Sequence, residues 1–208
     1  MVLSLNDRQL LEGLKHLIAQ HGYSPTIREL ETHLGISSRS ALQNTLERLR
    51  QQGCLTWQLG RARTYQLLAA NLPLQGTIQA GYLVEHPTDT LEYVWVLPEH
   101  PGQRYLAQDY ALKVCGDSMI DLQICQGDLV VMRPTNDLWS IKAGQVAAVW
   151  IEGEGATLKR LYYREGDASV ILESGNQHCP RRQLSRHQIG LLGVLVSSPQ
   201  NYWYSDRG

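Results

Sequence analysis

Residues 114–120 of the chain read Val-Cys-Gly-Asp-Ser-Met-Ile and overlap the end of an alternating apolar run, Tyr110–Cys115. Alternation followed by a Gly-Asp-Ser turn sequence predicts a half-buried β-strand with Ser118 at its exit. A second strand-like run, Ala156–Leu161, contains Lys159. The sequence therefore predicts a β-structured unit that carries a serine just after one strand and a lysine within another.

The segment from residue 74 to residue 208 is expected to be mainly β. It shows short apolar or alternating runs separated by Gly- and Asp-rich turn sequences, and no helical periodicity competes with them. Besides the run that ends at Cys115, these runs are Leu129–Met132, Gln145–Ile151, Thr157–Tyr163, Ser169–Glu173 and Ile189–Ser197. We expect them to form a compact sheet assembly.

Residues 1–68 show helical periodicity instead. Leucine residues recur at helical spacing early in this segment, and Asn6 is placed to cap the helix that they form. Thr26-Ile27-Arg28-Glu29 has the pattern of a capping box that opens a second helix. Gly35 is placed to end that helix in the left-handed conformation.

A third helix is expected to begin at Ser37 or Ser38. Beyond it, two strand-like runs flank a hairpin with Gly60 at its tip, and Arg61 and Arg63 lie on this hairpin. Two helices joined by a short Gly-containing turn are typical of a helix-turn-helix. Three helices followed by a basic hairpin therefore predict a winged helix-turn-helix.

On such a scaffold, the third helix would lie in the major groove of DNA. Its exposed early positions are expected to be Ser38, Arg39, Ser40, Ala41, Gln43 and Asn44. Hydroxyl and amide groups can pair with base edges, whereas arginine side chains suit phosphates. We therefore predict DNA contacts from this helix face and from Arg61 and Arg63 on the hairpin.

The distribution of charge agrees with this division, in which residues 69–73 (Ala-Ala-Asn-Leu-Pro) are expected to form a linker. The whole chain has a net charge of −1, but residues 1–70 contain eight Lys or Arg against five Asp or Glu. A local excess of cations suits a phosphate-facing surface, and an ordinary solvated face is the alternative interpretation.

The four cysteines show no paired spacing, so we expect free thiols, no metal site and no cofactor. The longest apolar run, Val146–Ile151, is too short to span a bilayer, and the amino-terminal residues lack a signal-peptide pattern. These features predict a cytoplasmic protein that has no membrane partner.

Ser118 and Lys159 are a candidate nucleophile and its base. A serine hydroxyl is a weak nucleophile at neutral pH and needs a neighbouring base. An unperturbed lysine has a pKa of about 10.4, and apolar surroundings lower it by disfavouring the ammonium form. Leu158 and Leu161 flank Lys159 and supply such surroundings. Most serines after strands are simple turn residues, however, so these residues alone leave both interpretations open.

Several motifs occur in one order along the chain: Tyr23–Leu30, Leu72–Gly81, Val114–Met119, Gly127–Leu129 and Leu158–Leu161. Together they resemble the LexA repressors, which belong to the self-cleaving Ser-Lys peptidases of the S24 family. The resemblance covers most of the chain. It implies an N-terminal winged helix-turn-helix domain over residues 1–68 and a mainly-β domain of the LexA and signal-peptidase type over residues 74–208.

The resemblance also implies a mechanism, in which Ser118 attacks the Ala80–Gly81 peptide bond and neutral Lys159 takes the hydroxyl proton. It implies a repressor of DNA-damage response genes that binds double-stranded operator DNA as a homodimer. The C-terminal domain would form the dimer, with Ile189–Val196 as the expected pairing strand. The implied co-protease is a filament of RecA on single-stranded DNA. Separating the two domains would lower avidity and release the operator.

Two features leave alternatives open. Gln79 precedes the implied cleavage site where family members carry a small apolar residue, so the rate of self-cleavage is not implied, and neither is an operator sequence. One alternative is a repressor of this fold controlled by a ligand, by redox state or by a partner, for which Cys115 close to Ser118 is the only hint. Another is a processing peptidase related to signal peptidases. The processing peptidase is disfavoured because the sequence shows no apparent membrane anchor and does show a winged helix. The winged helix also disfavours a UmuD-like polymerase accessory protein.

Overall fold

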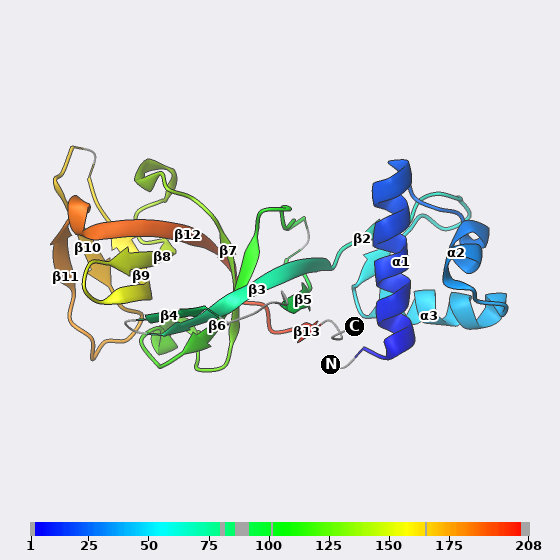
Figure 1. Ribbon diagram of the computed structural model, residues 1–208, viewed down its shortest axis with the longest axis horizontal. Coiled ribbons are helices and arrows are strands. Elements are labelled where there is room, and N and C mark those ends of the chain that lie inside the picture. Colours follow the sequence, from blue (N-terminus) through cyan, green and yellow to red (C-terminus); the bar gives the residue numbers. More distant parts are fainter. Residues whose placement is uncertain (1–2, 80–81, 86–91, 101, 165, 205–208) are drawn as a thin grey trace. The chain divides into compact units, whose positions relative to one another are not determined.

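The computed structural model describes residues 3–79, 82–85, 92–100, 102–164 and 166–204 (Figure 1). The chain divides into two compact units. Unit 1 consists of residues 1–71, 95–104 and 201–208, and unit 2 consists of residues 72–94 and 105–200. All three α-helices of the described residues lie in unit 1.

Unit 1 is a three-helix fold with a small hairpin. It contains α1 (Leu5–His21), α2 (Ile27–Leu34), α3 (Arg39–Gln51), β1 (Leu55–Thr56) and β2 (Gln66–Leu67). The strands β1 and β2 pair antiparallel. The order of three helices followed by a hairpin confirms the expectation drawn from the sequence.

Side-chain caps explain where the helices begin. Ser4, and not the expected Asn6, caps α1: its hydroxyl accepts a hydrogen bond from the backbone N–H of Asp7 (3.3 Å), and the Asp7 carboxylate accepts one from Ser4 N (2.9 Å). This reciprocal pair satisfies two backbone donors, which Asn6 inside the first turn could not do. Thr26 and Glu29 form the predicted capping box at the start of α2.

Leucine side chains from the three helices form most of the core of unit 1. The buried ones are Leu10, Leu11, Leu14, Leu17, Leu30, Leu42, Leu46 and Leu49. Gly35 has a φ of 64° and ends α2 in the left-handed conformation, as predicted. Gly13 lets α1 approach α2 closely, because a Cβ atom there would lie 2.7 Å from Leu34 Cδ2.

The rest of the regular structure is mainly β. The strands are β3 (Ala70–Gln79), β4 (Tyr82–Glu85), β5 (Glu92–Val96), β6 (Tyr110–Cys115), β7 (Leu129–Arg133), β8 (Val146–Ile151), β9 (Gly155–Tyr162), β10 (Ser169–Glu173), β11 (Arg182–Ser185), β12 (Ile189–Ser197) and β13 (Tyr202–Tyr204). Short 3₁₀ turns occur at Ile120–Leu122, Leu138–Ser140 and Arg186–Gln188. Each of the six runs predicted from the sequence is a strand, with its ends shifted by at most two residues.

These eleven strands of the described residues form one sheet. Its order is β11-β10-β9-β8-β12-β7-β6-β3-β5-β13, and β4 pairs with β3. The β3–β6 pair is parallel, and the pairs that join β6, β7, β12, β8, β9, β10 and β11 are antiparallel. β6 is buried more fully than the half-buried strand that its alternation predicts, since four of its six residues are buried and Lys113 is exposed.

The segment expected to be a linker contains the start of a strand. β3 begins at Ala70 and therefore includes most of residues 69–73, and the boundary between the two units falls between Asn71 and Leu72. Leu72 and Leu74 are both buried. Together they continue the alternation of a strand across Pro73. The free energy gained by burying these two leucines outweighs the preference of Pro73 and the small residues before it for a turn.

β12 has two strand neighbours over only part of its length. It pairs with β8 through Ile189–Val194 and with β7 through Val194–Ser197. Among the described strands, none pairs with the other edge of residues 189–193. Dimer formation through Ile189–Val196 therefore stays a prediction.

Candidate DNA-binding surface and candidate catalytic site

The face of α3 predicted to contact DNA is exposed. Ser38 caps the helix, its hydroxyl accepting a hydrogen bond from Ala41 N (3.4 Å). The other predicted contact residues, Arg39, Ser40, Ala41, Gln43 and Asn44, are all exposed. Leu42, Leu46 and Leu49 occupy the buried side of the same helix. Helical periodicity thus separates a packed stripe from a polar stripe that is available to a ligand.

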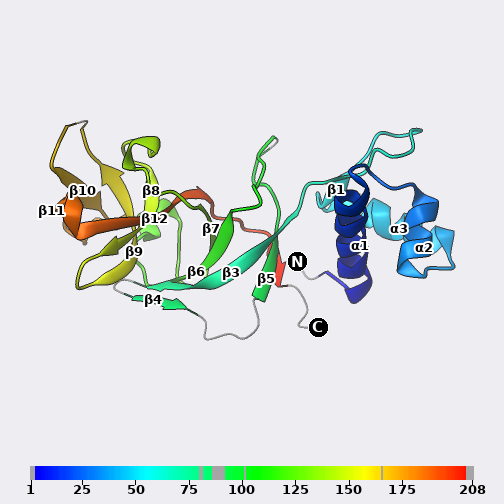
Figure 2. The same cartoon turned by 45° about the horizontal axis from the view of Figure 1, so that its top comes forward.

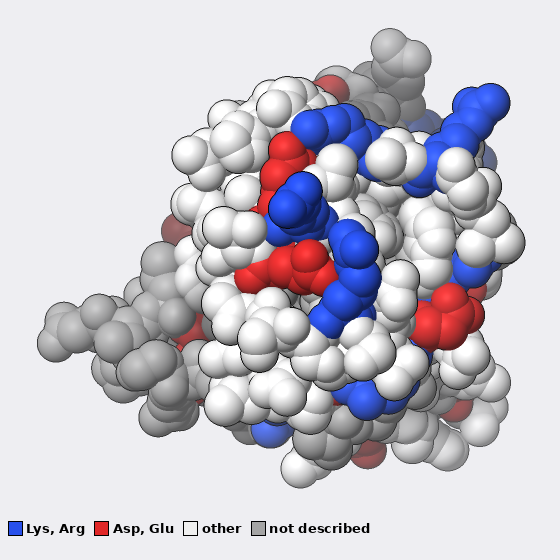
Figure 3. Space-filling view, turned by 90° about the vertical axis from the view of Figure 1, so that its right-hand side faces the viewer, with Lys and Arg blue, Asp and Glu red and all other residues white. Residues whose placement is uncertain are grey.

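Cationic side chains on unit 1 alternate with acidic ones. Figure 3 shows blue and red groups interleaved on the face that it presents. Arg39 Nε lies 3.2 Å from Glu31 Oε1, and Arg63 Nη2 lies 2.7 Å from Glu29 Oε1. The surface is therefore less positive than the number of arginine residues indicates, since two of the predicted DNA-contact arginines already have carboxylate partners.

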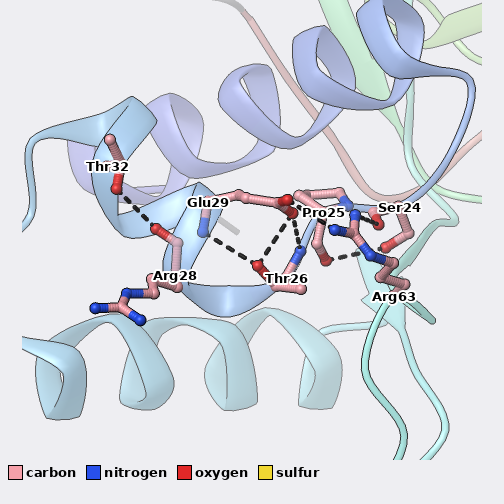
Figure 4. Close-up of polar contacts among 7 residues, drawn as sticks. All are labelled: Ser24, Pro25, Thr26, Arg28, Glu29, Thr32 and Arg63. Carbon is pink, nitrogen blue, oxygen red and sulfur yellow. Dashed lines mark hydrogen bonds and ion pairs between the residues drawn. The ribbon is translucent and has the colours of Figure 1, made fainter.

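Arg63 fastens the hairpin to the start of α2 (Figure 4). Its guanidinium donates to Glu29 Oε1 and also lies 4.6 Å from the ring centre of Tyr23. The other Glu29 oxygen accepts hydrogen bonds from the backbone N–H (2.7 Å) and the hydroxyl (3.0 Å) of Thr26. These bonds, the one from Thr26 N first and that from Arg63 next, lower the pKa of Glu29 to about 2.

The second hairpin arginine is placed differently. Arg61 is exposed, and its side chain makes a long contact of 3.4 Å with Gln58 Oε1. Arg63 by contrast has a left-handed backbone with φ of 61°, a conformation that costs free energy for a residue with a Cβ and that its side-chain contacts stabilise. Of the two predicted phosphate contacts on the hairpin, Arg61 is the one whose guanidinium has no acidic partner among the described residues.

Ser118 lies in the turn between β6 and the 3₁₀ turn Ile120–Leu122, where it is half-buried. Gly116 opens this turn with a φ of 95°, a conformation that suits glycine. Ile120 N donates to Asp117 O (3.2 Å) and closes the turn around Ser118. Met119 is fully buried and anchors the turn in the core of unit 2.

Lys159 lies on β9 and is also half-buried. Its Nζ atom donates a hydrogen bond to Thr157 Oγ1 (3.2 Å), and Thr157 lies two residues earlier on the same face of the strand. Burial lowers the pKa of Lys159, and the Arg182 charge lowers it further, while Cys179 and Glu154 act in the opposite direction. The apolar surroundings predicted from the sequence thus favour the neutral amine, which is the form a base requires.

One buried cluster connects the surroundings of Ser118 and Lys159. Met119, next to Ser118, and Leu158, next to Lys159, both belong to it, together with residues of β6, β7 and β8. The segment of residues 174–179 also reaches both places. Its Asn176 donates to Asp117 O (3.2 Å), and its Cys179 is close enough to Lys159 to influence that residue's charge.

The predicted cleavage residues, Ala80 and Gly81, lie outside the described residues. Their neighbours on either side are described: Gln79 of β3 pairs with Tyr82 of β4. The Cα atoms of β4 approach within 8 Å of those of β9, and the two strands lie close together in both ribbon views (Figure 1 and Figure 2). The chain that follows Gly81 therefore runs beside the strand that carries Lys159.

Reasoning from the sequence missed three features of these sites. Thr157 could have been found, because a hydroxyl two residues before a strand lysine shares its face. The contact between Arg63 and Glu29 and the contact between Asn176 and Asp117 join residues far apart in the chain, and no local signal announces them. Within the described part of the chain, no cluster of three or more His, Cys, Asp or Glu could hold a metal ion, and no helix is long and apolar enough to cross a membrane.

Comparison with known proteins matches both parts of the chain. Residues 2–64 match the LexA DNA binding domain, and residues 73–196 match the Peptidase S24-like family. The chain is 31% identical to the LexA repressor of Roseiflexus sp. over 216 residues, covering 97% of each chain. It is 27% identical over 203 residues to the "Transcription regulator LexA" of Synechocystis sp. (96% of this chain and 97% of that one), and 33% identical over 190 residues to LexA repressor 1 of Nocardia farcinica (84% and 83%). The chain therefore belongs to the LexA family of DNA-binding repressors, with a LexA DNA-binding domain followed by a peptidase S24 domain.

Proposed function

We propose that this repressor is inactivated by cutting its own chain between Ala80 and Gly81. Ser118 is the nucleophile and Lys159 is the base. The observation that carries the proposal is the position of β4, which directly follows the proposed bond and lies beside β9, the strand of Lys159. A chain that delivers its own peptide bond to a base on a neighbouring strand needs no second molecule as substrate.

The chemistry follows from the groups involved. The Ser118 hydroxyl oxygen bonds to the Ala80 carbonyl carbon while its proton moves to the neutral amine of Lys159. The tetrahedral intermediate then expels the Gly81 nitrogen, which takes that proton from the Lys159 ammonium. Water hydrolyses the resulting ester and regenerates Ser118. Burial of Lys159 supports this assignment, because a lowered pKa supplies the neutral amine at a lower pH.

The remaining parts of the proposal concern DNA. The exposed face of α3 and the hairpin arginine Arg61 contact operator DNA, and a homodimer formed through the C-terminal domain binds two half-sites. The repressed genes are those of the DNA-damage response, and a filament of RecA on single-stranded DNA stimulates the cleavage. Cutting the chain at Ala80–Gly81 separates the DNA-binding domain from the dimerising domain, which lowers avidity and releases the operator.

The test is incubation of the purified protein at alkaline pH without a partner. We expect first-order conversion to fragments 1–80 and 81–208, at a rate that does not depend on protein concentration and rises with pH as Lys159 loses its proton. Ser118→Ala and Lys159→Ala should each abolish the reaction. Lys142→Ala is the matched control, because Lys142 is an exposed lysine of the same domain.

A second candidate function is a repressor of the same fold whose activity is set by a ligand, by redox state or by a partner. The position of Cys179 favours it, since this free and half-buried residue is among the groups that influence the pKa of Lys159. Wild-type protein that stays intact at a pH of about 10, near the pKa of free lysine, would support this candidate and refute self-cleavage.

A further inference from the structure

The segment of residues 174–179, here called the clamp segment, joins β10 to β11 and packs against the turn that carries Ser118. Two hydrogen bonds fasten it to Asp121, in the 3₁₀ turn that directly follows Met119. Asp121 N donates to Gly175 O (2.7 Å), and Gln177 N donates to the Asp121 carboxylate (2.8 Å). The clamp segment and the Ser118 turn are therefore joined in both directions, although more than fifty residues of sequence separate them.

The fit between the two segments is close. Gly175 N lies 3.3 Å from Met119 Sδ. A Cβ atom on Gly175 would lie 2.8 Å from Leu122 Cγ and 3.1 Å from Met119 Cα, and the latter is a backbone atom that cannot turn aside. Any larger residue at this position would push the clamp segment away from the turn.

Asn176 makes the contact nearest to the proposed nucleophile. Its Nδ2 donates to Asp117 O (3.2 Å), and its Oδ1 accepts from His178 N (2.9 Å). The second bond fixes which way the amide group faces, so that the donor points at Asp117. Asp117 O and the N–H of Ser118 belong to one planar peptide group. Ile120 N also donates to this carbonyl (3.2 Å), and Asn176 supplies a second donor from outside the turn. Together these donors set the direction of the Ser118 N–H and the position of the Ser118 Cα.

The clamp segment also ends close to the proposed base. Cys179 N donates to Asn176 O (3.0 Å), and Cys179 is one of the groups that influence Lys159. A single short segment thus contacts the turn of Ser118 at one end and lies near Lys159 at the other.

We propose that Asn176 is a positioning residue for self-cleavage, which orients the Asp117–Ser118 peptide group and with it the nucleophile Ser118. The inference rests on the proposed function. It assigns no proton transfer to Asn176, which acts only through the backbone of the nucleophile. Misplacing a nucleophile by about 1 Å can lower a rate by roughly 100-fold, so one hydrogen bond at this point has a large effect on the reaction.

The test compares Asn176→Asp with Asn136→Asp in the full chain at several alkaline pH values. Asn176→Asp keeps the size of the side chain and the acceptor for His178 N, but it replaces the donor that faces Asp117 with an oxygen. Asn136→Asp makes the same substitution at an exposed position of the same unit, outside the clamp segment and the Ser118 turn. Asn176→Asp should lower the first-order rate between about 10-fold and about 100-fold at every pH, without moving the pH at which the rate is half-maximal. Asn136→Asp should cleave like the wild type.

Gly175→Ala is a second variant that weakens the Asn176–Asp117 contact, because the added methyl group pushes the clamp segment away from the Ser118 turn. It should slow cleavage in the same way. Thermal unfolding of each variant shows whether the fold persists, and Gly175→Ala carries the test if Asn176→Asp does not fold. The inference is overturned if Asn176→Asp cleaves at the wild-type rate or if Asn136→Asp is slowed equally. It is also overturned if the half-maximal pH of Asn176→Asp moves, which would place the effect on Lys159. If the wild type and Asn136→Asp both stay intact, the proposed function itself fails, and that outcome is distinct.

Discussion

The two arginine residues of the hairpin should affect DNA binding in different ways. Arg63 is held by Glu29 and Tyr23, whereas Arg61 is exposed and has no acidic partner among the described contacts. We therefore expect Arg61 to neutralise a phosphate and Arg63 to keep the hairpin fastened to α2. The matched perturbations are Arg61→Gln and Arg63→Gln, which remove the same charge from positions two residues apart.

The size of the difference follows from counterion release. Each neutralised phosphate contributes about −0.9 to the slope of log affinity against log salt concentration. Between about 50 mM and about 200 mM salt, one contact therefore accounts for a change in affinity of roughly 3.5-fold. Arg61→Gln should make the slope shallower by about this one contact. Arg63→Gln should leave the slope unchanged and weaken binding by the same factor at every salt concentration, because the hairpin loses its support.

The assay is fluorescence anisotropy of a labelled DNA duplex titrated at four or more salt concentrations. A duplex of arbitrary sequence is sufficient, since phosphate contacts are read without base specificity. Arg164→Gln in unit 2 is the control for a general loss of positive charge, because Arg164 is exposed and outside the DNA-binding domain. Equal changes of slope in Arg61→Gln and Arg63→Gln would refute the reasoning, as would a change confined to Arg63→Gln.

Three further predictions concern single ion pairs and the buried lysine. Arg133→Met should lower the free energy of unfolding by about 3 kcal/mol, because Asp109 is fully buried and, among the described contacts, would keep only its hydrogen bond from Leu106 N. This value is the low end for breaking a buried ion pair, since Arg133 itself is 34% exposed. Urea unfolding measures the change, and a loss under about 1 kcal/mol, the usual value of a surface pair, would contradict the prediction. The Glu29 carboxyl group should titrate with a pKa of about 2, which NMR of its side-chain carboxyl carbon measures. Its ionised form then stabilises the fold fully above its ordinary pKa of 4.5, and this stabilisation is lost as the pH falls toward 2. In Arg63→Gln the pKa of Glu29 should rise yet stay below 4.5, because the hydrogen bonds from Thr26 remain. Lys159→Met should abolish self-cleavage but raise the thermal midpoint at neutral pH, because a buried ammonium costs free energy that a thioether of similar length does not, and a lower midpoint would show that Lys159 stabilises the fold.

The surroundings of Lys159 and Ser118 explain how one domain can combine a stable sheet with a reactive site. β9 places Lys159 beside Thr157 on an ordinary strand face, and the Ser118 turn is anchored by Met119 in the core. Neither feature requires an unusual fold. The reactivity that we propose depends on burial of one amine and on the orientation of one peptide group, and both are set by neighbouring segments.

The sequence by itself determined the elements whose signals are local. The three helices, the Thr26–Glu29 capping box, the left-handed Gly35 and the strand Tyr110–Cys115 were all predictable, because caps and periodicity act within a few residues. The exposed face of α3 followed from the same periodicity. These features needed no knowledge of what lies on the other side of the core.

Only the tertiary structure decided which distant residues meet. Four features depend on partners far along the chain. They are the strand that begins within the expected linker, the position of β12 between β8 and β7 in the sheet order, the Arg63–Glu29 pair and the Asn176–Asp117 contact. Such contacts arise because closing a long loop costs little more entropy than closing a medium one, so many distant pairings compete and burial of the whole sheet selects among them. The residues that could act as nucleophile and base were visible in the sequence, and the segment that holds them in place was not.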